Sequence, residues 1–156
     1  MYTALLAIHS WLRWPVLLAG LAAVILGITG AAARRPWGAT DEAAGRWFVT
    51  GLDVQMLIGI VIYVFLSPFT MSAWGDMAET MRNGPLRLIV IEHQVGMIAA
   101  VALAHIGRAR IRKTSDPARR HRLAAIFFGL ALVAALVTIP WPFMGGGRPL
   151  FRGLGI

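Results

Sequence analysis

Four long apolar stretches restrict what this chain of 156 residues can fold into more than any other feature. A helix needs about 20 predominantly apolar residues to cross a bilayer. The stretches that reach this length lie at about residues 4–33, 47–66, 88–107 and 123–143. Only 14% of the residues are charged, whereas soluble domains contain roughly 25%. The sequence therefore predicts an all-α integral membrane protein that forms a single four-helix transmembrane bundle over residues 1–156 in the lipid bilayer.

Most of the basic residues lie in two of the loops between these stretches. Ten of the 15 Lys and Arg residues are found there: Arg34, Arg35, Arg46, Arg108, Arg110, Arg112, Lys113, Arg119, Arg120 and Arg122. Basic loops of membrane proteins remain on the cytoplasmic side and attract anionic lipid headgroups. We therefore expect a bacterial inner (cytoplasmic) membrane protein with both termini periplasmic. This placement accounts for the net charge of +8, and we expect no nucleic-acid partner.

The chain contains no cysteine. Disulfides, thiolate metal sites, iron–sulfur clusters and covalently attached haem are therefore excluded, because each of them needs cysteine. Glycine-rich phosphate loops and the sequence context of a hydrolase triad are also missing from the sequence. The sequence thus gives no sign of the common nucleotide-binding or hydrolytic enzymes.

The loop after the second stretch has a helical pattern of its own. Met71, Trp74, Met77 and Met81 recur at helical spacing, and acidic and basic residues lie off that stripe. The pattern predicts a short interfacial helix over residues 70–82 on the outer membrane surface. Such a helix either links the second stretch to the third or forms a lid over a site beneath it. The chain beyond Pro140 and Pro142 is expected to lie outside the membrane as extended chain.

Ionisable side chains lie within two of the apolar stretches. His9 and Arg13 share a face of the first stretch, and Glu92 and His93 are adjacent in the third. Charge inside a bilayer is costly, so such residues mark a functional site by default. Both helices enter from the outer side, and their histidines reach a common depth. Two imidazoles from different helices of a bundle are the usual ligands of b-type haem iron. The sequence predicts one haem b bound by His9 and His93.

Further residues fit this interpretation. Gly96 begins a ridge of small residues that leaves room for a flat ring, and Arg13 or Arg87 can neutralise a propionate. An alternative interpretation needs no cofactor. In it, Glu92 pairs with Arg13 to fix the helix register, and the small residues only allow close packing.

A second haem near the cytoplasmic ends of the helices is less favoured. His105 and His121 could face each other there, but His93 and His105 are 12 residues apart. That spacing corresponds to about 120° around a helix, so one face cannot serve two stacked haems. His121 stands in an arginine-rich stretch and has the character of an ordinary loop histidine. Asp53 lies inside the second apolar stretch and needs a partner, for which His105 is the candidate.

Several segments carry a resemblance: "MYTALLAIHSWLRW", "LDVQMLIGIVIYVFLSP", "LRLIVIEHQVGM" and "IPWPF". They resemble small four-helix bacterial membrane proteins that are labelled cytochrome b-like. The resemblance covers nearly the whole chain and implies electron transfer. His9, Arg13, Glu92 and His93 fall in the recurring segments of that group, whereas its second helix often has a histidine where this chain has Asp53. The resemblance therefore favours the outer site over an inner one.

Taken together, these observations predict a b-type cytochrome that passes single electrons between a quinol pool and a larger redox complex. We expect its haem near the periplasmic side and quinone as a second small-molecule partner. We expect an electron carrier or redox subunit rather than a stand-alone enzyme, associated with a larger membrane complex or with further copies of itself. The alternative, from a different class, is a cofactor-free accessory subunit of a respiratory or photosynthetic complex.

Overall fold

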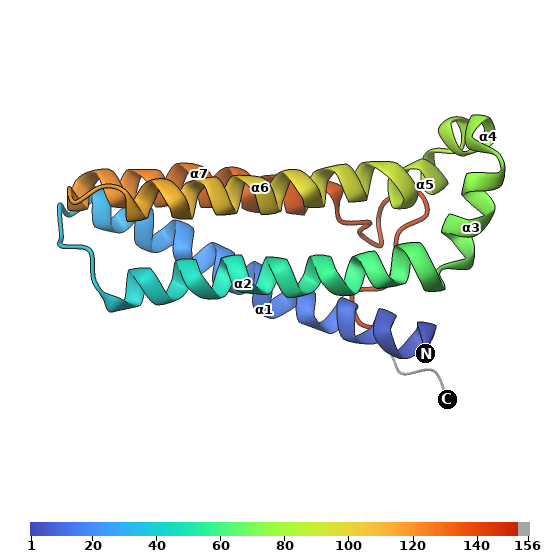
Figure 1. The fold of residues 1–156 in the computed structure, drawn as a ribbon, viewed down its shortest axis with the longest axis horizontal. Helices are drawn as coiled ribbons and strands as arrows, with labels where there is room; N and C mark the ends of the chain where they lie inside the picture. The colour runs from blue at the N-terminus through green and yellow to red at the C-terminus, as the bar shows by residue number, and fades with distance from the viewer. Residues whose placement is uncertain (153–156) are drawn as a thin grey trace.

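The computed structural model describes residues 1–152, and its regular elements in that range are all helical. Four long helices alternate in direction along the bundle (Figure 1): α1 (Tyr2–Ala32), α2 (Ala39–Val61), α6 (His93–Arg112) and α7 (Pro117–Thr138). Together with the turns that extend α2 and α6, they are long and apolar enough to cross a membrane. The predicted all-α bundle with four membrane-spanning helices is confirmed, and we treat the protein as integral to a lipid bilayer.

The second span begins earlier than the apolar pattern predicts. We expected it to begin near residue 47, but α2 begins at Ala39. The Asp41 carboxylate accepts a hydrogen bond from the Gly38 backbone N–H (2.9 Å) and two from the Arg35 guanidinium (2.5 and 2.7 Å). These bonds stabilise a polar first turn that hydrophobicity alone does not detect. They also raise the pKa of Arg35, because the neighbouring carboxylate favours the charged guanidinium.

The fourth span is displaced in the same way at its start and is shorter at its end. It was predicted over residues 123–143, but α7 runs from Pro117 to Thr138. The Asp116 carboxylate caps its first turn by accepting from the Ala118 N–H (3.1 Å). At the other end, Pro140 and Pro142 have no N–H to donate and therefore stop the helix. Figure 1 shows that α7 ends well before the neighbouring ends of α1 and α2.

Two wide helical turns occur at one end of the bundle. The π-helical turn η1 (Ile62–Leu66) extends α2, and a second one, η2 (Leu88–Glu92), connects α5 (Gly84–Arg87) to α6. Turns of this kind are rare and frequently mark functional sites. We call this end, where Met1 also lies, the terminal end. The opposite end, with the loops at residues 33–38 and 113–116, is called the basic end.

The predicted interfacial helix is two helices. The segment over residues 70–82 forms α3 (Pro68–Gly75) and α4 (Met77–Arg82), so its helical character is confirmed but its continuity is not. Asp76 separates them, because its backbone leaves the helical region and its carboxylate caps α4 by accepting from the Glu79 N–H (2.9 Å). Both helices lie beyond the terminal end of the bundle in Figure 1.

The segment after α7 does not extend away from the bundle, as the sequence suggested. It folds back, and the Arg148 N–H donates to the Pro140 carbonyl (2.9 Å). The indole N–H of Trp11 then donates to the Arg152 carbonyl (3.0 Å) and that of Trp14 to the Leu150 carbonyl (3.2 Å). We call residues 139–152 the tail. It packs against α1 at the terminal end, beyond the point where α7 stops.

The core at the middle of the bundle is built from aromatic rings fitted against glycines. Phe48 of α2 and Phe128 of α7 are fully buried, and their rings meet edge to face with centroids 5.8 Å apart. A Cβ atom at Gly20 would come within 2.6 Å of the Phe48 ring, and one at Gly45 within 3.0 Å of the Phe128 ring. Glycine at these positions lets α1, α2 and α7 approach closely.

Candidate cofactor-binding site

A cavity lies at the terminal end, among α1, α2, α6 and the tail. It encloses about 1290 Å³ of empty space, including the part that is open to the outside. Its lining reaches from Tyr2 and Phe69 at the mouth to Leu52 and Val101 deeper in the bundle. The cavity exists because α7 ends at Thr138, so the tail rather than a fourth helix closes that quarter of the bundle.

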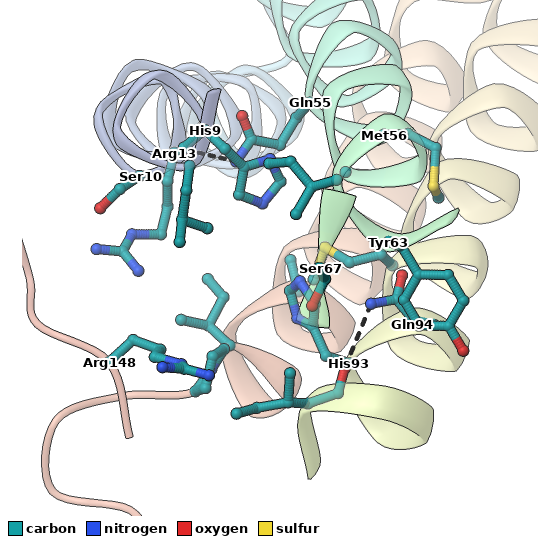
Figure 2. Close-up of a pocket in the computed structure, with 18 of the residues that line it drawn as sticks. His9, Ser10, Arg13, Gln55, Met56, Tyr63, Ser67, His93, Gln94 and Arg148 are labelled. Carbon is teal, nitrogen blue, oxygen red and sulfur yellow. Dashed lines mark hydrogen bonds between the residues drawn. The ribbon is translucent and has the colours of Figure 1, made fainter. Parts of the chain in front are cut away.

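His9 of α1 and His93 of α6 face each other across this cavity (Figure 2). Their ring centroids are 6.5 Å apart, and the ring planes are nearly perpendicular, at 84°. Two imidazoles on opposite sides of one metal ion, each with a bond of about 2.0 Å, would place their centroids roughly 6–6.5 Å apart. The separation therefore fits a pair of ligands to one metal ion. The structure brings together the two histidines that the sequence singled out.

A backbone carbonyl orients the ring of His93. Its Nδ1 lies 3.0 Å from the Thr138 carbonyl oxygen. A carbonyl can only accept, so Nδ1 carries the hydrogen and Nε2 keeps its lone pair. The carbonyl is available because its ordinary helical donor would be residue 142, which is Pro142 and has no N–H. Metal-binding histidines usually donate their second ring nitrogen in this way, which makes the bound nitrogen a stronger ligand.

The position of His9 is set by α2. The Gln55 side chain, itself 8% exposed, donates to the His9 backbone carbonyl (2.8 Å), as Figure 2 shows. A Cβ atom at Gly59 would come within 3.3 Å of the His9 ring, so the glycine leaves room for the imidazole. Within residues 1–152, the buried Nδ1 of His9 has no hydrogen-bond partner. This nitrogen lies beside Gly59 and is not exposed to the cavity, so His9 lacks the orienting hydrogen bond that His93 has.

Three arginines line the cavity, and no Asp or Glu among the described residues lines it with them. Arg13 donates to the Leu150 carbonyl (2.6 Å), and its guanidinium lies over the rings of both Trp14 and Trp141. Arg148 lies over the ring of Phe69, and Arg152 is the third. Three cations that share an apolar cavity without a carboxylate favour a ligand that carries negative charge at its outer edge.

Three expected members of the site are elsewhere. Glu92 pairs with Arg87, one turn before it (Nε to Oε1, 2.7 Å), and neither residue lines the cavity. The interpretation in which Glu92 pairs with Arg13 is therefore wrong, since Arg13 is held by the tail. Gly96 does not leave room for a flat ring either. It packs against Thr138, where a Cβ atom would collide with the threonine side chain, and it thereby helps to place the carbonyl that orients His93.

The residues considered for a second haem, His105, His121 and Asp53, do not form one site near the basic end. The expected pair of Asp53 and His105 is confirmed, with Oδ1 and Nε2 2.8 Å apart. His121 is not a loop residue: it lies in α7, is fully buried, packs on Gly30 and has Trp37 at 5.0 Å. The side chain of His105 is 52% exposed, so the two imidazoles occupy different surroundings. The arrangement gives no support to a second haem.

Sequence analysis missed the contribution of Thr138 and of the two tail arginines. A signal for Thr138 was present, because a proline four residues after a helical residue leaves that residue's carbonyl without its donor. The arginines gave no comparable signal, since only the folded tail brings Arg148 and Arg152 to α1. Comparison of the chain with protein-family models, with curated proteins and with solved structures gave no match.

Proposed function

We propose that this protein is a membrane b-type cytochrome that holds one haem between His9 and His93 and passes single electrons. One observation carries the proposal: two imidazoles from different helices lie 6.5 Å apart in an apolar cavity, and one of them is oriented by a carbonyl. Two protein ligands are what an iron ion needs when a porphyrin occupies its other four positions. The three lining arginines suit the negatively charged propionates of such a group.

The residues of the chain have separable parts in this function. When bound, haem supplies reversible one-electron oxidation and reduction. His9 and His93 would hold the haem iron through their ring nitrogens, and a haem held by two histidines would carry electrons rather than bind oxygen. The Thr138 carbonyl strengthens His93 as a ligand. Arg13, Arg148 and Arg152 would hold the acidic edge of the haem, and their positive charge would favour its reduced state.

The proposal also includes a place in the cell. The two basic loops would lie in the cytoplasm of a bacterium, by the tendency of basic loops to stay on that side of the inner membrane. The cavity and the N-terminus would then be periplasmic. Electrons would come from the quinol pool and pass to a larger redox complex, because a carrier without an open iron position needs a donor and an acceptor.

The test is the haem content of the purified protein. Expressed with ample haem, the protein should show a Soret band, a reduced-minus-oxidised spectrum of b type, and about one haem per chain. His9→Ala and His93→Ala should each abolish or severely reduce the bound haem, because each removes one of the two side chains that would hold the iron. His105→Ala is the matched control, since it also removes a histidine, yet one that lies outside the cavity.

Two results would overturn the proposal: a wild-type protein without a Soret band, or a band that persists after both His9 and His93 are replaced. A cofactor-free accessory subunit would then be the better account. A loss of haem in His105→Ala would instead restore the idea of a second haem.

A further inference from the structure

The pair of Asp53 and His105 lies on the outer surface of the bundle, within two membrane spans. Asp53 belongs to α2 and His105 to α6, and their side chains are 40% and 52% exposed. Asp53 comes six residues after Trp47, about 9 Å further along the helix, so its carboxylate lies inside the apolar layer. Polar side chains at such a depth almost always face protein or water rather than lipid.

The pair keeps hydrogen-bonding capacity that the described residues do not use. The only hydrogen bond of either side chain within residues 1–152 is the one that joins them, from Nε2 to Oδ1. As an ion pair, it leaves one donor, the Nδ1–H of His105, and one acceptor, Oδ2 of Asp53. Among the described residues, the other ion pair between these two helices joins Arg108 to Glu42 (2.8 Å) and lies closer to the basic end.

The surface around the pair allows a close approach. Ala102 and Ala109 lie one turn on either side of His105 along α6, and Thr50 lies one turn before Asp53 on α2. All three are exposed. Small residues beside a hydrogen-bonding side chain are typical of interfaces between transmembrane helices.

We infer that this face binds a second copy of the same chain, related to the first by a two-fold axis. A two-fold interface pairs a surface with itself, so it needs a donor and an acceptor on the same patch. The leftover Nδ1–H and Oδ2 meet this requirement: His105 of each copy donates to Asp53 of the other. The four side chains then form a closed ring of hydrogen bonds without net charge. The inference is independent of the haem.

Because the chain has no cysteine, a disulfide between two copies can form only at the position of the single introduced cysteine, and it gives a species of twice the mass of the chain. Ala102→Cys and Ala109→Cys should form disulfide-linked dimers in the native membrane under mild oxidation. Ile126→Cys is the control, because it is 54% exposed on α7 at about the same distance from the basic end as Ala102. Cross-linking at position 102 or 109 should exceed the control several-fold. Equal cross-linking at all three positions would overturn the inference.

A charge exchange tests the chemistry. Asp53→His places two imidazoles on each copy and should weaken dimerisation in mild detergent by about ten-fold, the effect of losing two interhelical hydrogen bonds. Asp53→His combined with His105→Asp restores one donor and one acceptor and should restore the dimer. Circular dichroism checks that each variant keeps its helices. A wild-type protein that is monomeric in the membrane and in mild detergent, or a dimer indifferent to Asp53→His, contradicts the inference.

Discussion

Glycines in the helices of this protein leave room for the bulky side chains of neighbouring helices and so determine where those side chains lie. Several of them, among which are Gly20, Gly30, Gly59 and Gly96, face a ring or a side chain of another helix so closely that a methyl group would contact or displace it. Two of these close contacts concern the proposed site directly, because Gly59 faces His9 and Gly96 faces Thr138. In a membrane helix such glycines replace the hydrophobic effect as the means of bringing helices together, since lipid is as apolar as the core.

The first prediction concerns Gly30, which faces the buried ring of His121. A methyl group there would collide with the imidazole, and His121 cannot move away because it is fully buried. Gly30→Ala should therefore destabilise the protein by up to about 2 kcal/mol, the difference between an overpacking cost of about 1–3 kcal/mol and a gain of about 1 kcal/mol in helix propensity. Gly129→Ala is the control, because open space surrounds a Cβ atom at that position. Thermal unfolding of both variants in detergent is the measurement, and equal stabilities would contradict the close packing.

At the scale of whole elements, the end of α7 is the decisive feature. Pro140 and Pro142 stop the helix and release two carbonyls. The Leu136 carbonyl accepts from the Trp141 indole N–H (2.8 Å), and the Thr138 carbonyl bonds His93. The same helix end leaves the space that becomes the cavity. One pair of prolines thus accounts for both the volume of the site and the orientation of one of its histidines.

The second prediction distinguishes the effect of Pro142 on the proposed site from that of Pro140. Pro142→Ala introduces an N–H that can compete with His93 for the Thr138 carbonyl, so His93 becomes a weaker ligand. Haem affinity should fall by about ten-fold or more, as for other changes to the partners of metal ligands. Pro140→Ala introduces an N–H that can compete only for the Leu136 carbonyl, so it should leave the haem affinity unchanged. Haem titration of the two variants decides, and equal affinities would mean that the carbonyl does not support the ligand.

For the whole molecule, the two ends of the bundle differ in character. The basic end has short loops joined to arginine-rich helix ends, and the terminal end has the cavity, the π-helical turns, α3, α4 and the tail. Charge asymmetry of this kind sets the orientation of a membrane protein, and it would place the proposed site on the periplasmic side.

The third prediction tests this orientation in whole cells. Ser115→Cys places a single thiol at the basic end, and Gly75→Cys places one at the terminal end, where nothing lies within 4 Å of its Cβ position. A maleimide that cannot cross the inner membrane should label Gly75→Cys in intact cells and Ser115→Cys only after lysis. Labelling in the opposite order would reverse the orientation and move the proposed site to the cytoplasmic side.

The sequence by itself determined the four membrane spans, because span length and apolar composition are local properties of the chain. It also indicated His9 and His93, since helical periodicity and the alternating direction of the spans bring both to one depth. Only the tertiary structure decided that Thr138 orients His93, that Arg87 rather than Arg13 pairs with Glu92, and that His121 is buried. It also brought the tail arginines to the cavity. These contacts depend on where α7 ends and on which faces of the helices pack together. When all faces of a helix are apolar, its sequence does not indicate which face packs against which neighbouring helix. The close fit of side chains decides which faces pack together.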